Sequence, residues 1–119
     1  MDNANKYEMQ YISILADLHM RPGLYIGCPS LEKLFGFMAG YEVAVYHLSG
    51  YRITINNRLY SYICKKLMKC EQESSLYQLI RDGRSDEEGF DYYFHEFNLY
   101  REHIDQSDYG SSISQSGDG

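Results

Sequence analysis

The chain has 119 residues, of which 44% are hydrophobic and 24% charged, and its formal net charge at pH 7 is −6. This length suits one domain with its own hydrophobic core and argues against a second domain. No stretch of eighteen apolar residues occurs, and residues 1–5 lack the basic and apolar regions of a signal peptide, so we expect a soluble cytoplasmic protein.

The first predicted element is an amphipathic helix over about residues 6–19. Its apolar residues recur at three- and four-residue steps along one stripe, namely Tyr7, Tyr11, Ile14, Leu15 and Leu18. The helix must end near residue 20, because Pro22 disfavours the α conformation at Arg21.

Residues 21–29, which contain both prolines, are predicted to form an extended corner shaped by Arg21, Pro22, Gly23, Tyr25 and Gly27. The two glycines are free to take positive φ. Residues 24–26 read as a short extended segment, and residues 52–55 alternate and are rich in β-branched side chains. Because an isolated two-stranded ribbon is marginal in water, whether these two segments pair as strands stays open.

A long second helix is predicted over residues 31–48, with Ser30 as its N-cap and Ser49 and Gly50 at its end. Gly36 and Gly40 inside it each cost roughly 1 kcal/mol relative to alanine, so we expect another element to pack closely there. A third helix begins at about Asn57; its apolar residues step by four, and its outer face is basic.

Two capping boxes predict the last two helices. Ser75 with Gln78 opens a short helix that ends at Gly83, and Ser85 with Glu88 opens a helix that runs to about Ile104. The chain is thus predicted to be a mostly α bundle of about five helices over residues 1–106, followed by a flexible Ser/Gly-rich tail over residues 107–119.

The last predicted helix has two different faces. Its apolar face holds Phe90, Phe94, Phe97, Arg101 and Ile104, with Tyr93 and Tyr100 at the edge. The opposite face holds Asp91, His95, Asn98, Glu102 and Asp105. Burial of the phenylalanines would leave the second face as an acidic stripe in solvent.

Charge is divided unevenly along the chain. Residues 1–70 carry eight Lys or Arg and five Asp or Glu, whereas residues 71–108 carry three and eleven. An acidic surface repels nucleic acid and anionic lipid and attracts a basic partner. Thirteen tyrosines against no tryptophan also favour protein binding, since tyrosine is common in protein interfaces.

The sequence offers no catalytic constellation. Its three cysteines, Cys28, Cys64 and Cys70, have neither CxxC spacing nor histidines at zinc-finger spacing, and its four histidines are scattered. We therefore expect no metal, no cofactor and no enzymatic activity.

Two resemblances carry further expectations. The segment RPGLYIG at residues 21–27 resembles RPGMYIG at the start of the ATPase domain of gyrase-B-like topoisomerase subunits. In that family the next helix carries a glutamate and an asparagine that handle water and magnesium. Here residues 31–48 contain Glu32 and Glu42 but no asparagine, and no Gly-rich lid follows.

The longer resemblance combines this corner with Ser30-Leu31, Leu34, Phe37, Gly40 and Tyr41, and with the segment DEEGFD at residues 86–91 followed by Tyr93, Phe94, Glu96, Phe97 and Tyr100. With these segments the chain is similar to a group of small bacterial proteins that look like immunity proteins of toxin systems. The resemblance implies that the chain binds a toxin domain and blocks it, and it supplies no catalytic residue.

The leading hypothesis is therefore an immunity protein that occludes a cognate toxin domain, expected to be basic and of the nuclease type, without direct contact with nucleic acid or membrane. Its predicted binding residues are Asp91, Tyr92, His95, Glu102 and Asp105, with Tyr92 as the anchor. Two alternatives are a regulatory or adaptor protein and a nucleotide-binding fragment.

Overall fold

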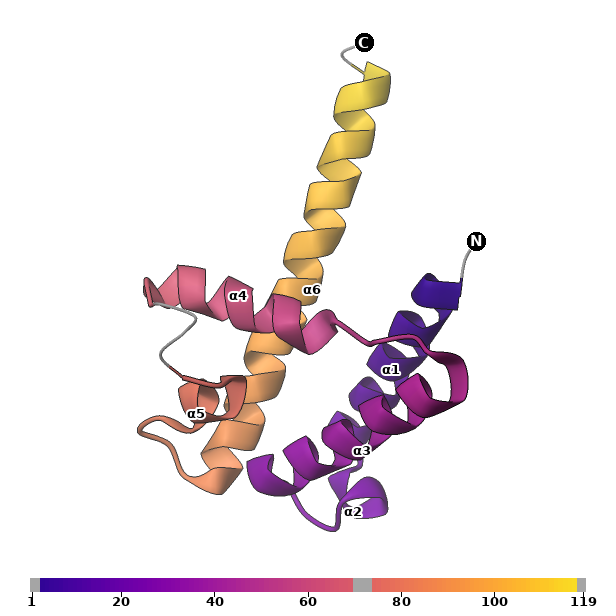
Figure 1. Cartoon of the computed structure of the whole chain (residues 1–119). Coiled ribbons are helices and arrows are strands. Elements are labelled where there is room, and N and C mark those ends of the chain that lie inside the picture. The colour runs from indigo at the N-terminus through magenta and orange to yellow at the C-terminus, as the bar shows by residue number, and fades with distance from the viewer. Residues whose placement is uncertain (1–2, 70–73, 118–119) are drawn as a thin grey trace.

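The computed structural model describes the backbone of residues 3–69 and 74–117 and the side chains of residues 6–69 and 74–104. These residues form six helices and no strand (Figure 1): α1 (Asn3–Met20), α2 (Pro22–Tyr25), α3 (Leu31–Ser49), α4 (Ile55–Leu67), α5 (Leu76–Arg81) and α6 (Asp86–Gly117). The prediction of a mostly α-helical domain is confirmed.

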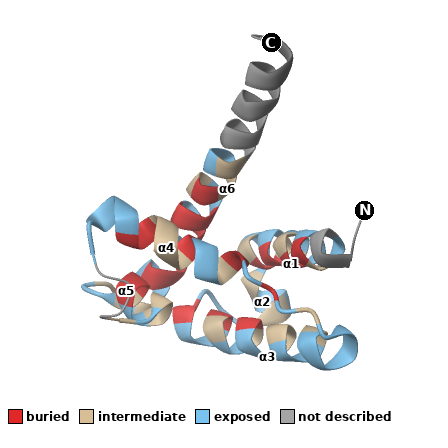
Figure 2. Cartoon of the chain, turned by 45° about the horizontal axis from the view of Figure 1, so that its top comes forward, coloured by how far each residue is buried: buried red, intermediate tan, exposed pale blue. Residues whose placement is uncertain are grey.

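Helix α6 is the element around which the others pack. Helices α3, α4 and α5 all contact it; in Figure 1, α4 crosses in front of it, α5 lies to its left and α1 to α3 lie to its right. Five aromatic residues of α6 are buried, in the part that the other helices surround (Figure 2): Phe90, Tyr93, Phe94, Phe97 and Tyr100. The predicted apolar face of this helix is thus the centre of the core.

Helix α1 adds the second layer of this core. Tyr11, Leu15 and Leu18 are fully buried, as their spacing predicts. The ring of His19 stacks on Phe94 with 4.3 Å between ring centroids and 5° between their planes. The end of α1 is therefore fixed against α6 by an aromatic contact.

The corner is helical where the sequence suggested an extended segment. Residues 22–25 form α2, with the N–H of Ile26 donating to the carbonyl of Pro22 at 2.8 Å. Proline favours this conformation at a first helical position, because its φ is already helical and no N–H donor is needed there. The expectation of an extended stretch at 24–26 is therefore wrong. The open question of a ribbon is answered as well: residues 51–54 are irregular and α4 begins at Ile55, so the two segments do not pair as strands.

Asp17 of α1 holds the corner in place. Its Oδ1 accepts a hydrogen bond from Nη2 of Arg21 at 2.6 Å, and its other oxygen accepts from the hydroxyl of Tyr25. The Tyr25 hydroxyl, and then the Arg21 guanidinium, lower the pKa of Asp17 below its ordinary value. Gly27 then reverses the chain with a φ of +92°, which few side chains tolerate.

The predicted helix caps are confirmed. Ser30 accepts from the N–H of Lys33 at 3.1 Å, and Gly50 ends α3 in the left-handed conformation with a φ of +80°. Both capping boxes are complete, since the N–H of Ser75 donates to Gln78 and that of Ser85 donates to Glu88, with the hydroxyls accepting in return. Local sequence thus determines where these helices begin.

The expectation about the glycines of α3 is wrong. No atom of another element lies within 4 Å of a Cβ added at Gly36 or Gly40, and both residues are exposed. Close packing occurs instead at Gly89 in α6, where a Cβ would lie 2.9 Å from Cδ2 of the buried Leu31. Gly89 is what allows the start of α3 to approach α6 closely.

Helix α6 is longer than its pattern predicts. Its backbone is helical to Gly117, whereas the apolar periodicity ends at Ile104. Side chains beyond Ile104 lie outside the described residues, so the predicted tail over residues 107–119 stays a prediction.

Candidate partner-binding surface

The predicted binding residues that the structure describes lie along α6. Asp91, His95 and Glu102 are exposed together with Asn98, and we call these four residues the outer stripe of α6. The side chain of Asp105, which was predicted to continue the stripe, lies outside the described residues. The stripe points away from the buried aromatic residues of the same helix, as the helical spacing requires.

Neither carboxylate of the outer stripe has an ion-pair partner within the described part of the chain. The three ion pairs found there join Arg21 to Asp17, Arg58 to Glu8 and Lys66 to Glu96. Asp91 and Glu102 therefore present uncompensated negative charge to solvent, which is the condition for attracting a basic partner.

Tyr92, the predicted anchor, is half-buried and already in contact with a cation. The Cζ atom of Arg84 lies 3.5 Å from the centroid of its ring. Arg84 is itself fixed, because its Nη1 donates to the carbonyls of Ile80 at 3.0 Å and Asp82 at 3.2 Å. The arrangement holds the Tyr92 ring rigidly and leaves less of it for a partner than the sequence suggested.

The first turns of α3 and α6 lie next to each other because Asp86 joins them. Its Oδ1 accepts from the N–H of Glu32 at 2.9 Å. The hydroxyl of Ser30, and then the N–H of Glu32, lower the pKa of Asp86 below its ordinary value. Glu32 and Glu87 are exposed on these two turns, so acidic surface extends from the outer stripe toward α3.

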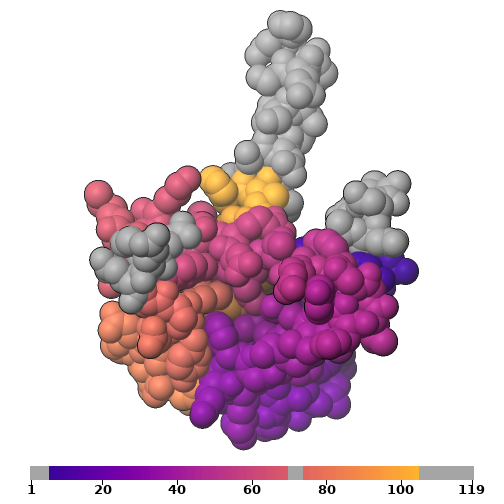
Figure 3. All heavy atoms as spheres, in the orientation of Figure 1, coloured from indigo at the N-terminus to yellow at the C-terminus, as the bar shows by residue number. Residues whose placement is uncertain are grey.

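An ion pair between an exposed lysine and a buried glutamate ties the basic helix α4 to the acidic helix α6. In Figures 1 and 3, α4 crosses in front of α6, and the two helices are in contact. Nζ of Lys66 lies 2.7 Å from Oε1 of Glu96, whose side chain is only 5% exposed. Hydrogen bonding to Glu96 raises the pKa of Lys66. The sequence did not predict that Glu96 is buried and paired, because an acidic residue in a helix is normally assigned to solvent.

Glu8 is a second buried carboxylate that sequence reasoning missed. It accepts hydrogen bonds from the hydroxyl of Tyr51, from the N–H of Thr54 at 2.8 Å and from Oγ1 of Thr54 at 3.2 Å, and it pairs with Arg58 at 3.5 Å. The segment before α4 is thus fastened to α1 by one side chain.

Glu42, which the sequence named only in the gyrase-like resemblance, is half-buried and belongs to a polar network at the edge of the core. Its Oε2 accepts from the hydroxyl of Tyr11 and from Nδ2 of Asn56 at 3.2 Å. Oδ1 of Asn56 accepts in turn from the hydroxyl of the fully buried Tyr93 at 2.6 Å. Burial, and then the charge of Glu42, raises the pKa of both Tyr11 and Tyr93. The network therefore joins α1, α3, α4 and α6 around one carboxylate.

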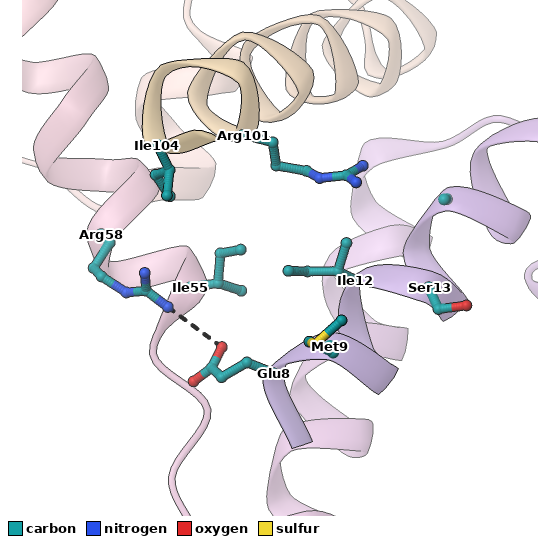
Figure 4. Close-up of a pocket in the computed structure, with 9 residues that line it drawn as sticks. Glu8, Met9, Ile12, Ser13, Ile55, Arg58, Arg101 and Ile104 are labelled. Atoms are coloured by element: carbon teal, nitrogen blue, oxygen red, sulfur yellow. Dashed lines mark hydrogen bonds and ion pairs between the residues drawn. The ribbon is translucent and has the colours of Figure 1, made fainter. Parts of the chain in front are cut away.

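A groove of about 620 Å³ separates α1 from α4 and α6 (Figure 4). Its walls are mainly apolar, with Ile12, Ile55 and Ile104 facing the space between the helices. The guanidinium of Arg101 reaches across it toward α1, over the ring of Phe97 at 5.8 Å from the ring centroid. Arg101, which the sequence placed on the apolar face, thus lies half-buried in this groove.

The described residues contain no group of three or more His, Cys, Asp or Glu side chains that could hold a metal ion. Cys28 is exposed and Cys64 is buried, while Cys70 lies outside the described residues. In the same part of the chain, no helix combines the length and the apolar character that crossing a membrane requires.

Comparison of the chain with protein-family models, with curated proteins and with solved structures finds no match in any of the three.

Proposed function

We propose that this protein is an immunity protein: it binds a basic toxin domain and neutralises it by covering its surface. One observation carries the proposal, namely that Asp91 and Glu102 are exposed on the outer stripe of α6 and have no ion-pair partner among the described residues. Such charges steer a basic partner onto the helix and raise its rate of association.

Nuclease domains fit this description of the partner. They carry positive charge where they bind phosphate groups, so an acidic helix competes for the same surface. Inhibition then needs only coverage of that surface, and it needs no catalytic group on the inhibitor.

Co-expression tests the function. The chain should protect cells against the toxin domain encoded next to it and should copurify with that domain. Failure of every neighbouring toxin domain to be neutralised or bound would overturn the proposal and favour the adaptor alternative.

Association kinetics test the surface. Asp91→Asn with Glu102→Gln should slow association with the basic partner about tenfold at low salt and flatten its salt dependence. Gln10→Lys with Ala44→Lys raises the net charge by the same amount at exposed positions of α1 and α3 and is the matched control. Equal effects of the two double variants would place the interface elsewhere.

A further inference from the structure

Two hollows lie side by side between α3 and α4, on either side of Glu42. One, of about 370 Å³, is lined by residues that include Phe35, Asn56 and Tyr60, and the other, of about 440 Å³, by residues that include Tyr46 and Arg52. Ala39, Glu42 and Asn57 line both. Glu42 therefore stands where the two hollows meet.

The two oxygens of Glu42 are not equivalent. Oε2 receives both hydrogen bonds of the carboxylate, from Tyr11 and from Asn56. Oε1 receives none, and because every buried side-chain oxygen in the described residues has a partner, Oε1 is open to solvent. The network thus fixes the carboxylate by one oxygen and leaves the other free to accept from a ligand.

The smaller hollow suits a cation. Among the described residues, Glu42 is its only charged lining residue, and the rings of Phe35 and Tyr60 provide aromatic surface beside the carboxylate. A carboxylate next to aromatic rings is the environment that binds an ammonium or a guanidinium group, by a charge-assisted hydrogen bond and by cation–π attraction.

The larger hollow is less suitable. Arg52 and His47 line it together with Glu42, and the Cζ atom of Arg52 lies 4.1 Å from the centroid of the Tyr46 ring. A second cation entering this hollow would meet the guanidinium of Arg52, so the smaller hollow is the better site for a cation.

We propose that this smaller hollow, which we call the Glu42 pocket, takes a lysine or arginine side chain of the basic partner, with Oε1 of Glu42 as its acceptor. This inference rests on the proposed function. It adds a second contact, on α3 and α4, to the outer stripe of α6, and it assigns to the pocket the selectivity that two exposed carboxylates do not provide.

A titration of the isolated protein tests the pocket without any toxin. The probes are N-acetyl-argininamide and its uncharged analogue N-acetyl-citrullinamide, followed by the chemical shifts of the amide resonances. The arginine probe should shift the resonances of Ala39, Asn56 and Asn57, and the citrulline probe should bind at least about tenfold more weakly.

Glu42→Gln should weaken binding of the arginine probe about tenfold, whereas Glu32→Gln, at an exposed position of the same helix, should leave it unchanged. If Glu42→Gln fails to fold, Ala39→Leu decides, since it fills the pocket and keeps the carboxylate. Equal binding of both probes, or unchanged binding in Glu42→Gln and Ala39→Leu, would overturn the proposal.

Different results would overturn the proposed function and the Glu42 pocket. A toxin domain that binds the wild type and Glu42→Gln with equal affinity would leave the proposed function standing and exclude the pocket from the interface. Binding of the arginine probe by a protein that neutralises no toxin would leave the pocket standing and remove the function.

Discussion

The exposed glycines of α3 give a prediction about single residues. Gly36→Ala should raise the free energy of unfolding by about 0.5–1 kcal/mol, because alanine is the better helix former and its Cβ meets open space. Gly89→Ala gains the same propensity but pushes its Cβ against the buried Leu31, so it should stabilise less or destabilise. Urea unfolding of the two variants checks this; a larger gain for Gly89→Ala would contradict the close packing.

Tyr51 gives a prediction about pH. Burial, and then its hydrogen bond to Glu8, raises its pKa from 10.0 to about 12. Since the folded state favours the neutral phenol, this contribution to stability is complete below pH 10 and is lost as the pH rises from 10 to 12. When the pH rises from 9 to 11, the free energy of unfolding should fall by about 1 kcal/mol less in Tyr51→Phe than in the wild type, after allowance for solvent screening. Urea unfolding at the two pH values measures both losses, and equal losses would show that Tyr51 is not involved.

The pair between α4 and α6 gives a prediction about elements. Lys66→Met should lower the free energy of unfolding by about 1–2 kcal/mol, because it leaves the buried Glu96 charged and unpaired while the exposure of Lys66 to solvent weakens the pair. Lys66→Met with Glu96→Leu should recover most of this loss, since removal of both charges leaves nothing to be desolvated. Chemical denaturation of both variants measures the two free energies of unfolding. A double variant less stable than Lys66→Met would mean that the attraction within the pair exceeds the cost of desolvating its two charges.

Helix spacing predicted which positions are buried, but it did not predict that carboxylates occupy some of them. Glu8 precedes Tyr11, Leu15 and Leu18 at steps of three, four and three, and Glu42 follows Met38 by four, so both positions fall on the buried stripe of their helix. Only the acidic side chains of these two residues favoured a solvent-exposed position. Their hydrogen-bond donors come from other helices and from the segment before α4. Because these partners are distant in sequence, the helical periodicity could not predict them.

The same limit explains the remaining differences. Caps were predictable because each depends on residues three positions apart, as at Ser75 and Ser85. The corner was misjudged because a four-residue helix has no periodicity to detect, and the partner of its first helical turn, Asp17, lies in the preceding element. The outer stripe of α6 could be predicted, whereas the Glu42 pocket could not, since it exists only between two packed helices.

At the scale of the whole molecule, the fold is centred on one helix whose two faces serve different purposes. The buried aromatic face of α6 contacts α3, α4 and α5, and the opposite face presents Asp91 and Glu102 to solvent. A partner that binds the outer stripe therefore contacts the most firmly held helix of the domain. Such a surface is preorganised, which lowers the entropy that binding costs.

This arrangement predicts how the molecule opens. Amides of residues 90–100 in α6 should exchange with solvent deuterium only when the whole domain unfolds, because their side chains form the centre of the core. Amides of α2 should exchange through local opening at a lower free energy, since none of its residues is buried. Native-state hydrogen exchange, measured at increasing denaturant concentration, separates the two classes of amide, because the free energy of opening falls more steeply with denaturant for global than for local opening. If α2 were as protected as α6, the corner would belong to the same cooperative unit as the core, and unfolding could not begin there.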